Sequence, residues 1–125
     1  MKNIERKSVL VVDDEPASIM GLTKILDQDY TVYVAKNGAN AVKLAKEKLP
    51  DMILLDIIMP DMNGYEVISM LKNTIETKDI PVVFISGLGT DEYEEKGLEL
   101  GAVDYIHKPF APEIVKLRVR NQIKH

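Results

Sequence analysis

DMILLDIIMPDMNG, residues 51–64, joins a short apolar run to a loop sequence, and one aspartate, Asp56, lies at the junction. The run Met52–Leu55 is apolar at every position, which is typical of a strand covered on both faces of a parallel sheet. Pro60 and Gly64 are turn residues, so the chain leaves the sheet soon after Asp56. We therefore expect the Asp56 carboxylate at the carboxyl end of a buried strand, the edge where open α/β sheets bind ligands.

The rest of the chain repeats this alternation of a β-rich run and a helix-like segment. The predicted strands are Ser8–Val12, Tyr30–Ala35, Met52–Leu55, Val82–Ile85 and Ala102–Ile106. Helix boundaries are indicated by Pro16, Pro50 and Pro112. Five strands that alternate with five helices predict right-handed crossovers and a parallel sheet. The expected fold class is α/β, doubly wound, with helices on both faces.

Helical spacing of three and four residues predicts the core-facing side chains of the first two helices. They are Ile19, Leu22, Ile25 and Leu26, and Ala41, Val42, Ala45 and Leu49. The third helix carries the apolar residues Val67, Ile68 and Leu71, and the last helix carries Ile114, Val115, Leu117, Val119 and Ile123. The fourth helix, near Asp91–Leu100, is strongly charged, and Thr90 is its candidate N-cap.

Length and composition exclude several classes of protein. The 125 residues, 46% of them hydrophobic, suit one ordinary core, so we expect a single domain over residues 1–125. A net charge of -4 argues against direct nucleic-acid binding, and the absence of cysteine excludes disulfides and thiolate metal sites. No apolar run approaches the ~20 residues that span a bilayer. The expectation is a soluble, cytoplasmic domain without a membrane partner.

Polar side chains follow several predicted strands, at the edge where parallel strands end. They are Asp13, Asp14, Asp56, Ser86 and Lys108. Two carboxylates about 4 Å apart repel by roughly 4 kcal/mol at an effective dielectric of about 20, so three acids need a counter-charge. Lys108 offers one, and a hard divalent cation with oxygen ligands offers a larger one. Mg²⁺ fits such a site, and Mn²⁺ would also suit it.

The same residues suit phosphoryl transfer to a carboxylate. An aspartate can form an acyl phosphate if a metal and a lysine neutralise the phosphoryl oxygens. Ser86 could donate a hydrogen bond to one of those oxygens, and the small Gly87 would leave room for them. Each residue alone has a plainer explanation: a helix cap, a strand-end hydroxyl bonded to backbone, or a surface lysine. Their joint placement favours a site.

Four motifs in order, VLVVDDEP (9–16), LLDIIMPDMNG (54–64), VFISG (83–87) and DYIHKPF (104–110), resemble the receiver domain of two-component response regulators. The resemblance covers nearly the whole chain and implies the flavodoxin-like strand order 2-1-3-4-5. It implies that Asp56 is the phosphoacceptor and that Lys108 contacts the phosphoryl group. The implied Mg²⁺ ligands are Asp13, Asp14, Asp56 and the backbone carbonyl of Ile58.

The resemblance also implies a switch rather than a turnover enzyme. A histidine kinase, a phosphotransfer protein or a small acyl phosphate would phosphorylate Asp56, after which Ser86 would move toward the phosphoryl group and Tyr105 would turn inward. The surface of the fourth helix, fifth strand and fifth helix would then change its affinity for a downstream protein, an effector domain or a second copy of the chain. The chain could stand alone or form the N-terminal part of a longer regulator.

Other functions remain as alternatives. An aspartate-nucleophile phosphohydrolase usually has a second acid two residues after the nucleophile, where this chain has Ile58. A dinucleotide-binding module needs G-x-G-x-x-G after the first strand, whereas Gly87 and Gly89 follow the fourth and do not complete it. A degenerate receiver would bind partners without being phosphorylated. The presence of all the expected site residues argues against it.

Ile58 and Leu88 are also expected to flank the phosphoryl group, where apolar side chains cannot orient an attacking water.

Overall fold

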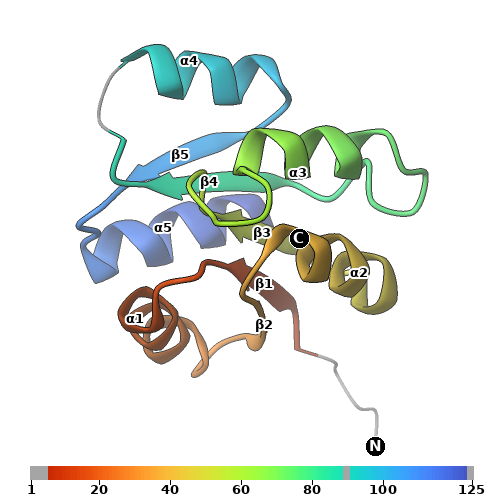
Figure 1. Cartoon of the computed structure of the whole chain (residues 1–125). Coiled ribbons are helices and arrows are strands. Elements are labelled where there is room, and N and C mark those ends of the chain that lie inside the picture. The colour runs from red at the N-terminus through yellow and green to blue at the C-terminus, as the bar shows by residue number, and fades with distance from the viewer. Residues whose placement is uncertain (1–5, 89–90, 124–125) are drawn as a thin grey trace, which may run out of the picture.

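The computed structural model describes residues 6–88 and 91–123, and it has the predicted α/β architecture (Figure 1). Strands and helices alternate along the chain, as the hydrophobic pattern predicts. Their bounds are β1 Ser8–Val12, α1 Pro16–Leu26, β2 Thr31–Ala35, α2 Gly38–Lys48, β3 Met52–Leu55, α3 Gly64–Lys72, β4 Val82–Ser86, α4 Asp91–Glu99, β5 Asp104–His107 and α5 Pro112–Ile123. None of the helices described is long and apolar enough to cross a membrane.

All the strands are parallel, in the order β2-β1-β3-β4-β5, so the predicted order is confirmed. In the register, Val12 pairs with Ala35 on one side and with Leu55 on the other. Asp13 and Asp56 directly follow Val12 and Leu55, so the two acids leave adjacent strands at the same level. This register, rather than their distance in sequence, brings them together.

Two hydrophobic clusters cover the two faces of the sheet, because successive strand residues point to opposite faces. Leu10 and Val12 join the cluster under α2 and α3, whereas Val9 and Val11 join the cluster under α1 and α5. Figure 1 shows α2, α3 and α4 on one side of the sheet and α1 and α5 on the other. Both faces are therefore covered, which explains the uninterrupted apolar runs of the central strands.

The prediction that Leu49 faces the core is wrong. Leu49 lies just after α2, has a left-handed backbone with φ 46° and ψ 59°, and is 54% exposed. It precedes Pro50, and the proline ring disfavours a right-handed helical conformation in the residue before it. The chain leaves the helix at this point, and the Leu49 side chain turns to solvent.

The C-terminal elements also differ from the prediction in detail. Ile114 and Leu117 are 41% and 42% exposed, because α5 buries only the narrow stripe of Val115, Val119 and Ile123. The fifth strand is Asp104–His107 rather than 102–106, since these residues are the ones that pair with β4. Thr90, the candidate cap of α4, lies outside the described residues.

Candidate functional site

The predicted site residues meet at the carboxyl edge of the sheet. A pocket of about 330 Å³ is lined by Asp14, Glu15, Asp56, Ile58, Ser86, Gly87 and Lys108. Asp13 is fully buried and reaches the site through its contact with the Lys108 ammonium. Parallel pairing therefore gathers side chains from the ends of β1, β3, β4 and β5 around one opening, as the sequence predicts.

Three carboxylates form an oxygen-rich cluster at this pocket. Asp13, Asp14 and Asp56 each have a carboxylate oxygen within 4.8 Å of the others. Asp13 is 0% and Asp56 is 5% exposed, while Asp14 faces solvent. Buried carboxylates are rarely left without cations, and oxygen-only donor sets suit hard divalent ions. The residues present therefore fit Mg²⁺.

Asp56 has an unusual proton affinity for an aspartate. Burial and the neighbouring Asp13 charge raise its pKa from 3.8 to about 6, against the opposing effect of the Lys108 charge. The Ile58 backbone N–H also donates to Asp56 Oδ1, at 3.4 Å. At neutral pH the carboxylate is still mostly ionised, so it can serve as a nucleophile.

Lys108 is the cation that neutralises these acids in the described structure. Its Nζ lies 2.9 Å from Asp13 Oδ2, 2.8 Å from Glu15 Oε1 and 3.5 Å from Asp56 Oδ2. Burial alone would lower the pKa of Lys108, but hydrogen bonds to Glu15 and Asp13 and the charge of Asp56 outweigh burial and raise it. The ammonium is therefore charged at any physiological pH. The peptide bond that follows it, Lys108–Pro109, is cis.

Glu15 is a site residue that the sequence analysis did not single out. Its backbone N–H donates to Asp13 Oδ1 at 2.9 Å, and its side chain accepts from Lys108 and from Ser18 Oγ. The Lys108 contact lowers the pKa of Glu15. The only sequence signal was its place after Asp13 and Asp14. That position does not reveal a contact with a lysine 93 residues away.

Ser86 and Tyr105 both contact the backbone of Leu88. The Ser86 hydroxyl accepts a hydrogen bond from Leu88 N–H at 3.2 Å, and Tyr105 Oη donates to the Leu88 carbonyl at 2.9 Å. Tyr105 is only 5% exposed, so its ring already lies inward, and burial raises its pKa. Apart from the two chain neighbours of Gly87, no described atom lies within 4 Å of a Cβ placed on it. The roles of Ser86 and Tyr105 in a switch stay predictions.

The loop between β3 and α3 carries Ile58 to the pocket and is held at several points. Gly64 N–H donates to the Ile57 carbonyl at 2.7 Å. Asp61 accepts hydrogen bonds from the backbone N–H groups of Gly38, at 2.9 Å, and Ala39, at 3.1 Å. The Gly38 bond is the main cause of the lowered pKa of Asp61. The sequence analysis did not predict this contact of Asp61 with α2.

Of the two apolar residues expected beside the phosphoryl group, only one lies at the pocket. Ile58 lines it, with 60% of its surface exposed. Leu88 instead packs against the core cluster under α2 and α3. Ile58 lies two residues after Asp56, and Leu88 lies two residues after Ser86. Neither side chain has a polar atom.

Comparison with known proteins agrees with the fold. Residues 9–120 match the family described as the response regulator receiver domain. The chain is 38% identical over its whole length to a protein of Vibrio cholerae serotype O1 named as a probable cyclic di-GMP phosphodiesterase, of which it covers 28%. It is 40% identical, over 93% of its length, to the transcriptional regulatory protein CusR of Escherichia coli K12, of which it covers 51%.

Both relatives are longer proteins, and this chain spans about half of their length or less. Among solved structures, the chemotaxis response regulator CheY4 of Vibrio cholerae is similar, with a TM-score of 0.87 and 27% identity. The match covers 93% of this chain and 98% of that one. The parallel sheet, the acidic cluster and the sequence match over residues 9–120 together show that this chain belongs to the response regulator receiver domain family of two-component systems.

Proposed function

We propose that Asp56 is the phosphoacceptor of this receiver domain and that a histidine kinase, a phosphotransfer protein or a small acyl phosphate supplies the phosphoryl group. The observation that carries the proposal is the position of the Asp56 carboxylate. It is buried at the base of an open pocket, within reach of Lys108 and beside two further acids. An isolated structural aspartate would need no such surroundings.

In the proposed reaction, an Asp56 carboxylate oxygen attacks the phosphorus of the donor. A new P–O bond forms as the bond from phosphorus to the leaving imidazole or carboxylate breaks, and the leaving group takes the electron pair. Lys108 would contact a phosphoryl oxygen, and Ser86 would donate to another. Mg²⁺, held by Asp13, Asp14, Asp56 and the Ile58 carbonyl, would neutralise the charge on the phosphoryl oxygens. The chain thus takes part in its own modification without turning over a substrate.

The experiment is incubation with acetyl phosphate and Mg²⁺, followed by mass spectrometry of the intact protein. We expect the wild type to gain the mass of one phosphoryl group and Asp56→Asn to gain none. Asp79→Asn, which changes an exposed aspartate away from the pocket, is the matched control and should behave as the wild type. No added mass on the wild type, or equal gain on Asp56→Asn, would contradict the proposal.

We further propose that the aspartyl phosphate is long-lived. Ile58 lines the pocket and has no polar atom that could orient a hydrolytic water, while the partly buried Leu88 side chain packs against the core cluster. After removal of acetyl phosphate, the added mass should persist for minutes or longer in Mg²⁺ buffer. Its loss within seconds, without a phosphatase, would show that another group activates the water.

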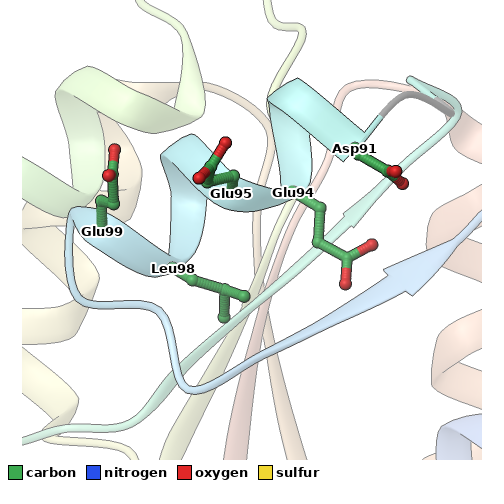
Figure 2. A pocket seen from close by; sticks show the side chains of 5 residues that line it. All are labelled: Asp91, Glu94, Glu95, Leu98 and Glu99. Carbon is green, nitrogen blue, oxygen red and sulfur yellow. The ribbon is translucent and has the colours of Figure 1, made fainter.

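The surface of α4, β5 and α5 is the proposed output face. A depression of about 610 Å³ on α4 is lined by Asp91, Glu94, Glu95, Leu98 and Glu99. Figure 2 shows these side chains along the helix. Beside it, His107 is exposed and its Nε2 lies 3.2 Å from Glu94 Oε1. The His107 ring centroid is 4.9 Å from that of Tyr105. Tyr105 thereby connects this face to the Leu88 carbonyl, next to Ser86.

The proposed partner of this face is a downstream protein or effector domain, or a second copy of the chain. Leu98, Val103, Ile114 and Leu117 are each more than 40% exposed, so the face offers apolar area as well as charge. Sedimentation velocity with and without acetyl phosphate distinguishes these partners. A dimer that forms only on phosphorylation would assign the face to self-association, and Leu117→Lys should then weaken the dimer.

A further inference from the structure

Glu15 makes the shortest of the three carboxylate contacts of Lys108. The ammonium lies 2.8 Å from Glu15, 2.9 Å from Asp13 and 3.5 Å from Asp56. Lys108 therefore lies farthest from the residue that would carry the phosphoryl group. The Glu15 side chain is 62% exposed and stands at the mouth of the pocket, in contrast to the buried Asp13.

The position of the Glu15 carboxylate is well supported. Its Oε1, the oxygen that accepts from Lys108, also accepts from the Ser18 hydroxyl at 3.1 Å. Its backbone N–H donates a hydrogen bond to Asp13 Oδ1 at 2.9 Å. Glu15 also immediately precedes α1, which begins at Pro16, where the proline ring limits the backbone. The carboxylate is thus directed toward Lys108 by the local fold rather than by chance.

This geometry creates a competition for one ammonium group. A lysine ammonium has three donor hydrogens, and all three carboxylates around Lys108 already lie within ion-pair distance. A phosphoryl group on Asp56 would need at least one of these donors. Asp13 belongs to the carboxylate cluster that would hold a cation, whereas Glu15 lies outside that cluster and would still compete for Lys108.

We propose that Glu15 is a positioning residue that holds Lys108 toward the pocket mouth and thereby restrains phosphorylation of Asp56. This inference rests on the proposed phosphoacceptor function. The Glu15 charge keeps part of the Lys108 charge neutralised while the donor approaches, and it competes with the phosphoryl oxygens afterwards. Removal of the charge therefore makes Lys108 more available at both stages.

The test is Glu15→Gln, which keeps the size of the side chain and removes its charge. We expect the initial rate of phosphorylation by acetyl phosphate and Mg²⁺ at low salt to rise about 1.5- to 5-fold, the range for a solvent-exposed ion pair. The gain should come mainly from a lower half-saturating concentration of acetyl phosphate. It should shrink near 1 M salt, where the Debye length is about 3 Å. Glu47→Gln, an exposed glutamate on α2, is the matched control and should leave the rate unchanged.

A double-mutant cycle shows whether Glu15 acts through Lys108. In a Lys108→Gln background the residual rate is lower, and Glu15→Gln should no longer raise it. If the increase persists in full, Glu15 repels the donor directly and the proposal is wrong. An unchanged or slower rate for Glu15→Gln in the wild-type background also overturns it. Equal thermal stability of wild type and Glu15→Gln would confirm that a change in the fold does not cause the higher phosphorylation rate.

A second measurement needs no phosphoryl donor. In metal-free buffer, hydrogen exchange of the ¹⁵N-labelled Lys108 ammonium should be faster in Glu15→Gln than in the wild type, because a neutral amide oxygen replaces the charged carboxylate acceptor and holds the ammonium less strongly. Unchanged exchange would overturn the inference even where the wild type accepts phosphoryl groups. Conversely, faster exchange in a protein that accepts no phosphoryl group would contradict the proposed function and leave the Glu15–Lys108 contact established.

Discussion

Asp56 is ionised at neutral pH in a place that favours its protonated form. Its pKa is raised from 3.8 to about 6, chiefly by burial. A carboxyl group with a raised pKa in the folded state stabilises the fold below its unfolded pKa, and that contribution is lost as the pH rises through the folded pKa. As the pH rises from about 4 to 6, the stability of the folded protein should therefore fall. At pH 7 the charge of Asp56 destabilises the fold.

Asp56→Asn should accordingly be more stable than the wild type at pH 7 in metal-free buffer. A rise of about two pKa units corresponds to about 3 kcal/mol at most, so a gain of about 1–3 kcal/mol is expected. The gain should disappear below about pH 4, where both forms carry a neutral group. Urea unfolding at the two pH values measures it, and a variant less stable than the wild type at pH 7 would contradict the assignment.

Gly64 occupies a point where no side chain fits. A Cβ on Gly64 would lie 2.5 Å from the Asp56 carbonyl oxygen and 2.9 Å from Ile57 Cα, and both of these are backbone atoms. Gly64→Ala should therefore cost about 1–3 kcal/mol of stability, as overpacking does. Gly87→Ala is the matched control for stability, because its Cβ meets open space among the described residues. Urea denaturation of both variants measures the difference. Equal stability would show that the loop between β3 and α3 shifts to accommodate the added Cβ at little cost.

At the level of elements, Asp61 links the loop after β3 to the start of α2. Its carboxylate accepts hydrogen bonds from two backbone N–H groups of α2. The first N–H groups of a helix have no acceptor within the helix itself. The lowered pKa of Asp61 means that these bonds hold well below neutral pH. The same loop carries Ile58, so Asp61 connects the start of α2 to a loop that lines the pocket around Asp56.

Asp61→Ala should speed hydrogen exchange at the Gly38 and Ala39 amides and slow phosphorylation by acetyl phosphate. Asp61→Asn retains one oxygen acceptor and should give intermediate values for both. Amide exchange measured by NMR and intact-mass kinetics check the two effects separately. Exchange that speeds up without any change in phosphorylation would limit Asp61 to the stability of α2.

For the whole molecule, a cation bound only by the folded protein must stabilise it. At a Mg²⁺ concentration 100 times the dissociation constant, the expected gain is about 2.7 kcal/mol. The melting temperature should therefore rise with added Mg²⁺. Asp13→Asn should reduce this increment, whatever its effect on stability without metal, because it removes one of the clustered carboxylates. An equal increment in wild type and Asp13→Asn would exclude Asp13 from the binding site.

Much of this arrangement could be predicted from the sequence alone, for a physical reason. Uninterrupted apolar runs such as Met52–Leu55 form strands that must be covered on both faces, and helices alternate with them, so a doubly wound parallel sheet follows. Parallel strands end at one edge. The acids after β1 and β3 and the lysine after β5 are therefore brought together whatever their distance along the chain.

What the sequence did not determine depends on the direction of individual side chains. Leu49, Ile114 and Leu117 fit the helical period, yet they are exposed because a following proline and a narrow contact between α5 and the sheet decide their burial. Glu15 and Asp61 are ordinary acids in the sequence. Only the packed fold brings Glu15 to Lys108 and Asp61 to α2, because both contacts join residues that no local pattern relates.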